Sequence, residues 1–114
     1  MNKKSVGNAG ESIACAYLKK IGYKILERNF RYEGGEIDII ALDKGVTVFI
    51  EVKYRSNLEF GYPADAVTRS KQRKIINGAK SYSVMRRIAD FPMRFDVVEV
   101  IGSEVNHIIG AFEA

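Results

Sequence analysis

Two stretches of the chain decide its fold: Gly35-Glu36-Ile37-Asp38-Ile39-Ile40 and Phe49-Ile50-Glu51-Val52-Lys53. Both are rich in β-branched residues, which favour extended backbone. The turn-forming residues Asp43-Lys44-Gly45 lie between them. The pattern therefore predicts an antiparallel hairpin with strands over residues 36–42 and 46–55.

The hydrophobic pattern selects the register of this hairpin, because a slip of one residue moves every side chain to the other face. A two-residue turn at Lys44-Gly45 puts Asp38 directly opposite Glu51, whereas a three-residue turn puts Ile50 there. Only the first register gives one wholly apolar face, which contains Ile37, Ile39, Ala41, Val48, Ile50 and Val52. We therefore predict that Asp38, Glu51 and Lys53 share the other face.

The remaining elements extend from the hairpin in both directions. Apolar spacing predicts one helix over residues 10–21, ended by Gly22, and a second helix over residues 68–88, capped by Thr68. Further strands are predicted over residues 23–30, 93–101 and 105–112, and a loop over residues 56–63. The order α-β-β-β-α-β-β predicts an α/β fold, a mixed sheet flanked by a helix on each face.

The composition bounds the class of protein. A chain of 114 residues fits one domain, residues 1–114, and 46% hydrophobic residues argue against disorder. A single cysteine, Cys15, excludes an internal disulfide and a four-thiolate zinc site, and we expect it to be buried in the first helix. No apolar run approaches the ~18 residues of a membrane-spanning helix, and no signal peptide is visible. We expect a cytoplasmic protein with no membrane partner.

Two carboxylates opposite each other in a sheet repel, so Asp38 and Glu51 need a counter-ion. Mg²⁺ prefers oxygen ligands and keeps water and phosphate oxygens in its shell. Lys53 can contact a metal-bound water or a phosphate from the same face. This set predicts metal-dependent phosphodiester hydrolysis. The alternative for Lys53 is a cross-strand salt bridge to Glu36, which lies opposite it in this register.

The wider pattern resembles the PD-(D/E)XK, restriction-endonuclease-like superfamily. Within it, the chain resembles the YraN-like family of predicted bacterial endonucleases, which are similar to archaeal Holliday junction resolvases. The segments that carry the resemblance are Gly10-Glu11, Gly35 to Ile40, Phe49 to Arg55, Phe60 to Pro63, Ala66-Val67 and Lys71 to Lys74. One departure is Ile37, which stands where the superfamily often has proline.

The resemblance implies roles for particular residues. Asp38 and Glu51 would be metal ligands and Lys53 the catalytic lysine, and Glu11 on the first helix would be a further ligand. The metal would be Mg²⁺ or Mn²⁺ and the substrate DNA, including branched or recombination-intermediate DNA. By itself, a glutamate near a helix start can also simply complement the helix dipole.

Gln72 is a further candidate for the catalytic set. It lies three and four residues before Ile75 and Ile76, so it faces inward from the second helix. Its amide could bond a metal-bound water or a phosphate. A hydrogen-bonded buried amide is the alternative.

The second helix predicts contacts with the DNA backbone. Residues 66–89 hold seven cations and no acid, whereas a merely solvated face would mix both signs. The predicted contacts are Arg55, Arg69, Lys71, Arg73 and Lys74. Tyr54 and Tyr62 could stack on bases or pack at the edge of the core. His107 stands alone on a late strand, and we expect it to be structural.

Three functions are therefore compared. The first is a DNA endonuclease, which the complete set of Asp38, Glu51 and Lys53 favours. The second is a non-catalytic nucleic-acid-binding module that kept the fold, and the third is an interaction protein that binds no nucleic acid. A homodimer is also predicted, because symmetric cleavage of a junction takes two sites and the late strands offer an apolar edge.

Overall fold

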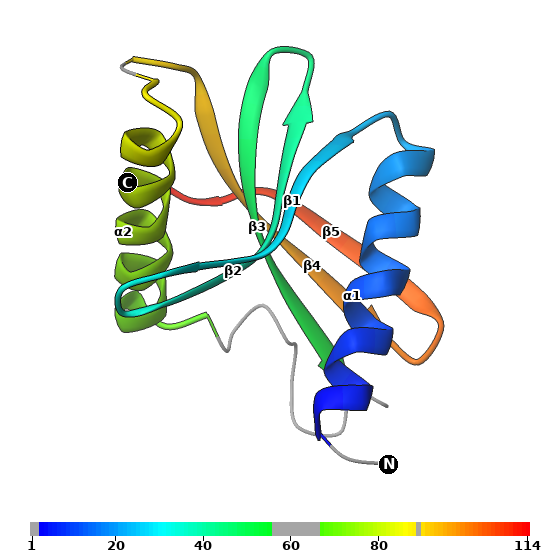
Figure 1. The fold of residues 1–114 in the computed structure, drawn as a ribbon. Coiled ribbons are helices and arrows are strands. Elements are labelled where there is room, and N and C mark those ends of the chain that lie inside the picture. Colours follow the sequence, from blue (N-terminus) through cyan, green and yellow to red (C-terminus); the bar gives the residue numbers. More distant parts are fainter. Residues whose placement is uncertain (1–2, 56–66, 89) are drawn as a thin grey trace.

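The computed structural model describes residues 3–55, 67–88 and 90–114 (Figure 1). Its elements are α1 (Lys3–Lys20), β1 (Lys24–Tyr32), β2 (Gly35–Asp43), β3 (Val46–Arg55), α2 (Arg69–Met85), β4 (Met93–Ile101) and β5 (Glu104–Phe112). The predicted α/β class and the order α-β-β-β-α-β-β are confirmed. The loop predicted over residues 56–63 lies outside the described residues.

The five strands form one mixed sheet in the order β1-β2-β3-β4-β5. Only β3 and β4 run parallel among these pairs, and a parallel pair needs a crossover, in which α2 lies. The two helices stand on opposite sides of the sheet (Figure 1). Neither helix in the described ranges has the length and apolarity needed to cross a bilayer.

Each helix buries its apolar stripe against one face of the sheet. On the α1 side, Ala14 and Leu18 pack with Ile39 and Ile50, and the free thiol of Cys15 is buried there as expected. The α2 side has its own cluster, formed by Phe30, Ile37, Ile40, Phe49, Ile75, Ala79, Tyr82 and Phe95. Each large apolar side chain buried in this way contributes about 1.5–3 kcal/mol of transfer free energy.

The ends of the helices follow the local sequence signals. Gly22 (φ +100°) follows α1 in the left-handed conformation that ends many helices. The Thr68 hydroxyl accepts the backbone N–H of Lys71 at 3.2 Å and so caps α2. Helix α2 ends at Met85, before the predicted Ile88, because Arg87 adopts a positive φ of 55°.

The turn signal Asn77-Gly78 lies inside α2 and does not interrupt it. Gly78 has a packing role instead, since a Cβ atom there would lie 2.6 Å from Cε1 of Tyr32. The absence of a side chain lets α2 approach the end of β1 closely. The two elements meet there, and the Tyr32 hydroxyl donates to the carbonyl of Lys74.

The predicted register of the central hairpin is confirmed from the turn as far as the pair of Ile39 and Ile50, and the regular pairs end before the predicted pair of Asp38 and Glu51. Lys44 and Gly45 form the two-residue turn, with φ angles of 49° and 86°, as hairpin turns of this length require. Asp43 pairs with Val46, and Ile39 pairs with Ile50. Ile39 and Ile50 are fully buried on the α1 side, as the hydrophobic pattern predicts.

The prediction that Ile37 shares a face with Ile39 is wrong. Ile37 packs in the α2-side cluster, whereas Ile39 packs beneath α1. The cause lies on the neighbouring strand, where Asn29 adopts a left-handed φ of 54°. Its neighbours Arg28 and Phe30 pair with Ile39 and Ile37, so Asn29 interrupts the pleat at the level of Asp38. Alternation of side chains therefore restarts on the opposite face beyond this point.

Candidate functional site

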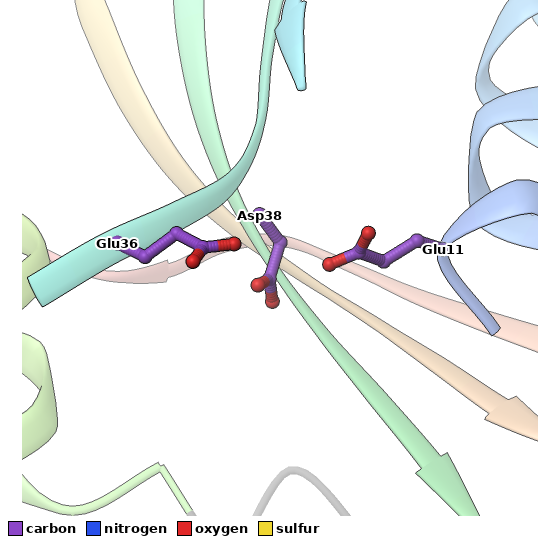
Figure 2. Close-up of side chains that lie close together, drawn as sticks. All are labelled: Glu11, Glu36 and Asp38. Carbon is purple, nitrogen blue, oxygen red and sulfur yellow. The ribbon is translucent and has the colours of Figure 1, made fainter. Parts of the chain in front are cut away.

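Three carboxylates meet at the interruption of the pleat. Glu11 comes from α1, and Glu36 and Asp38 come from β2. One oxygen from each lies within 4.8 Å of the other two. Figure 2 shows the side chains of Glu11 and Glu36 reaching toward Asp38 from opposite sides. Three hard oxygen donors at this spacing fit a divalent cation such as Mg²⁺.

The changed strand geometry explains why Glu36 joins this group. Beyond Asp38 the faces are exchanged, so Glu36 points toward α1 rather than α2. The Asn29 amide is oriented so that its nitrogen, and not its oxygen, faces the carboxylates. This nitrogen lies 3.0 Å from Glu11 Oε2 and 2.7 Å from Glu36 Oε1. The residue that bends the strand thus also donates to two of the carboxylates.

Asp38 carries little positive compensation. Its Oδ2 accepts the backbone N–H of Val52 at 2.8 Å, just beyond the last regular β2–β3 pair. Burial, and then the charge of Glu51, raise the pKa of Asp38 to about 8. Burial also raises the pKa of Glu11. Among the described residues, the ion pairs of this group involve its outer members, with Arg28 at 3.9 Å from Glu11 and Arg31 at 3.6 Å from Glu36.

Glu51 lies beside this group but faces two lysines. Its Oε1 is 2.7 Å from Nζ of Lys71 and 3.7 Å from Nζ of Lys53. The Glu51 side chain is only 6% exposed, so these ammonium groups provide the compensation that water cannot. Burial, and then Lys71, lower the pKa of Lys53.

A pocket of about 540 Å³ joins the carboxylates to the start of α2. The sheet side of the pocket includes Glu36, Asp38 and Glu51, and the helix side includes Thr68, Ser70, Lys71 and Lys74. The first turn of α2 contains no acidic residue, so its dipole and both lysines favour an anion. One pocket therefore presents ligands for a cation on one wall and for a phosphate on the other.

The structure brings most of the predicted site residues together. Glu11 and Asp38 belong to the group of three carboxylates, and Glu51 and Lys53 lie next to this group. Glu51 is not a member of that group within the described residues, since it pairs with Lys71. The alternative salt bridge from Lys53 to Glu36 does not form, because Glu36 pairs with Arg31.

Other candidates lie away from the pocket. The Gln72 amide donates to the carbonyl of Val67 at 3.1 Å, which matches the alternative of a satisfied amide. Tyr54 packs at the edge of the α1-side core and against Gly10. Arg69 and Arg73 are exposed on α2. Tyr62 and the side chain of Arg55 lie outside the described residues.

Glu36 is the site residue that the sequence pattern did not mark as a ligand. Its position two residues before Asp38 in Gly-Glu-Ile-Asp was visible. Strict alternation put Glu36 with Asp38 on the face of Lys53, directly opposite that lysine, because the apolar pattern gives no sign that Asn29 is left-handed. The structural role expected for His107 is confirmed, since it is 4% exposed and bonds Asp96 at 2.7 Å and Tyr17 at 3.1 Å.

Comparison with known sequences identifies the family. The profile of UPF0102, described as an uncharacterised protein family, matches residues 10–100. This chain belongs to the UPF0102 family. The YraN-like assignment is thereby confirmed.

Relatives align over nearly their whole length with this UPF0102 protein. A UPF0102 protein of Caldanaerobacter subterraneus subsp. tengcongensis is 47% identical, with 98% of each chain covered. One of Lachnoclostridium phytofermentans is 49% identical, covering 100% of this chain and 98% of its own. One of Clostridioides difficile is 46% identical, covering 98% of this chain and all of its own. The names of these relatives state the family and no activity.

Proposed function

We propose that this UPF0102 protein is a metal-dependent endonuclease that hydrolyses DNA phosphodiesters with Mg²⁺ or Mn²⁺. The observation that carries the proposal is the two-sided pocket. Carboxylates of β2 and β3 (Glu36, Asp38 and Glu51) face lysines and the start of α2 across a space of about 540 Å³, and Glu11 of α1 joins Glu36 and Asp38 beside it. A phosphodiester in contact with a divalent cation needs carboxylates that hold the cation and positive groups that bind the phosphate oxygens.

The residues divide the work according to their chemistry. Glu11, Glu36 and Asp38 would hold the cation, which when bound lowers the pKa of water and offsets charge on the phosphate. Lys71, Lys74 and the N–H groups at the start of α2 would bind the phosphate oxygens. Lys53, whose pKa burial lowers, is our candidate for transferring a proton.

The substrate class rests on charge and on the resemblance. Arg69 and Arg73 are exposed on the helix that borders the pocket, next to Lys71 and Lys74. Contacts of this kind supply affinity without sequence readout. The similarity to junction resolvases extends the proposal to branched and recombination-intermediate DNA.

A cleavage assay on linear, flapped and four-way DNA tests this proposal. Product should form with Mg²⁺ or Mn²⁺ and disappear with a chelator and in Asp38→Asn. Glu33→Gln is the matched control, because Glu33 is an exposed acid on the adjoining turn. Binding without cleavage would instead support the non-catalytic module, and no affinity for any polyanion would exclude both.

The salt dependence of DNA binding tests the basic helix separately. Neutralising Arg69, Lys71, Arg73 and Lys74 should weaken binding to all duplexes alike. The log–log salt slope should fall by about one unit for each phosphate that the helix no longer neutralises. An unchanged slope would show that this face does not meet the backbone.

The predicted homodimer belongs to the junction-cleaving version of the proposal. The described part of one chain forms one pocket with these groups, whereas symmetric cleavage takes two pockets related by a two-fold axis. Sedimentation equilibrium with and without DNA should show a dimer. A monomer in both conditions would leave a nuclease that makes a single nick or cuts flaps.

A further inference from the structure

Glu51 has two internal counter-ions that differ in their freedom to move. Lys71 and Lys53 approach the same oxygen, Oε1, at 2.7 Å and 3.7 Å. The Lys71 side chain is 42% exposed, whereas that of Lys53 is 22% exposed. Lys71 is therefore the ammonium group that can leave most easily, because its long side chain already borders solvent.

Lys71 is also the one of the two that borders the pocket. It lies in the first turn of α2, and its own backbone N–H is fixed by Thr68. Glu51 cannot turn to water in exchange, since its side chain is 6% exposed. If Lys71 leaves, Glu51 keeps only the longer contact with Lys53 among the described pairs, at 3.7 Å, so a nearby positive charge would have to replace Lys71.

That charge would come from a cation at the carboxylate group. Asp38 and Glu51 line the same pocket, and the charge of Glu51 raises the pKa of Asp38. A divalent cation held by Glu11, Glu36 and Asp38 would lie beside Glu51, would supply positive charge to it and, by repulsion, would disfavour an ammonium group on Glu51 Oε1. The cation and Lys71 are therefore competitors for one carboxylate.

We propose that Lys71 is a positioning residue that neutralises Glu51 in the metal-free protein and is released toward a substrate phosphate when a divalent cation binds. This inference rests on the proposed function of the pocket. It gives Lys71 two alternative partners, the carboxylate of Glu51 and a phosphate oxygen. Metal and phosphate should consequently strengthen each other's binding by the same factor.

Calorimetry of Mn²⁺ binding without DNA tests the competition directly. Lys71→Gln should bind Mn²⁺ about three- to tenfold more tightly than wild type, the range expected from removing one partly exposed ion pair. Lys71→Arg keeps a cation beside Glu51 and should stay close to wild type. Lys74→Gln is the matched control, because it removes an equal charge from the same helix and pocket without touching the described pair on Glu51.

The outcomes separate this inference from the proposed function. Tighter binding in Lys71→Gln but not in Lys74→Gln supports it, as does binding that appears only in Lys71→Gln. Wild-type binding that Lys71→Gln leaves unchanged or weakens overturns the inference alone. No Mn²⁺ binding by either protein overturns the metal centre as well. Lys71→Met serves as a second neutral variant, and circular dichroism confirms folding of each protein.

Discussion

Two aspartates of the same sheet, the half-buried Asp38 and the fully buried Asp96, show opposite electrostatics. Asp38 lies on β2 and Asp96 lies on β4, and each accepts a backbone N–H at an interruption of a strand pair, from Val52 and from Gly110 respectively. Burial raises the pKa of Asp38 to about 8, with the charge of Glu51 as the next cause. Burial also acts to raise that of Asp96, but its hydrogen bonds outweigh it and lower the pKa to about 2.

The partners account for the difference. Arg94 Nε lies 2.8 Å from Oδ1 of Asp96, and His107 Nε2 lies 2.7 Å from Oδ2. Both oxygens of this carboxylate are therefore compensated. Asp38 has other carboxylates as neighbours, and within the described part of the chain its hydrogen-bond donor is the backbone N–H of Val52. A compensated buried charge stabilises the fold, whereas an uncompensated one is kept for a ligand that arrives later. The comparison indicates that Asp96 stabilises the fold, and it supports the proposed role of Asp38 as a metal ligand.

Removing the charge at Asp96 should have the largest effect on the free energy of unfolding. Asp96→Asn leaves the charge of Arg94 without its buried partner, so the free energy of unfolding should fall by about 3–5 kcal/mol. Urea denaturation of wild type and variant measures the change. A loss below about 1 kcal/mol would show that the network of Asp96 adds little to stability.

Lowering the pH should remove the stabilisation that Asp96 provides in the wild-type protein. The folded pKa of Asp96, about 2, lies below its ordinary value of 3.8, so the unfolded chain takes up the proton first as the pH falls. The stability that Asp96 provides is complete above about pH 4 and is lost toward pH 2, which amounts to roughly 2 kcal/mol. Urea denaturation between these pH values should show this component in wild type and not in Asp96→Asn.

The same substitution at Asp38 should increase the free energy of unfolding instead of decreasing it. Asp38→Asn removes a charge that burial and Glu51 disfavour, so the metal-free protein should gain about 1 kcal/mol. The gain should be measured above pH 8, where the wild-type carboxylate is ionised. Calorimetry should show Mg²⁺ or Mn²⁺ affinity reduced at least about tenfold. A destabilised Asp38→Asn with normal metal affinity would make Asp38 a second structural aspartate.

Asn29 offers the smallest and most specific test. Asn29→Gly keeps the left-handed backbone but loses the amide between Glu11 and Glu36. Asn29→Ala loses the amide and also strains the backbone, so it should be less stable than the glycine variant by about 1 kcal/mol. Thermal melts of both variants measure the difference. Equal stability would remove backbone strain as the origin of the bent strand.

The sequence by itself determined the elements and the register of the central hairpin. The two-residue turn at Lys44-Gly45, the cap at Thr68 and the stop at Gly22 are each set by a few adjacent residues. The pairing of Ile39 with Ile50 follows from apolar alternation, because a slip would expose the buried face. Local signals and the period of two are sufficient for such features.

Tertiary structure alone decided which side chains meet at the candidate site. Glu36 joins Glu11 because a left-handed residue on the adjacent strand reverses the faces of β2 beyond Asp38. Lys71 contacts Glu51 from α2, twenty residues further along the chain. The run of cations on α2 does not by itself indicate which of them contacts the sheet. Interactions of this kind depend on how strands bend and how helices settle on a sheet. Those choices are made by packing across the whole fold and not by neighbouring residues.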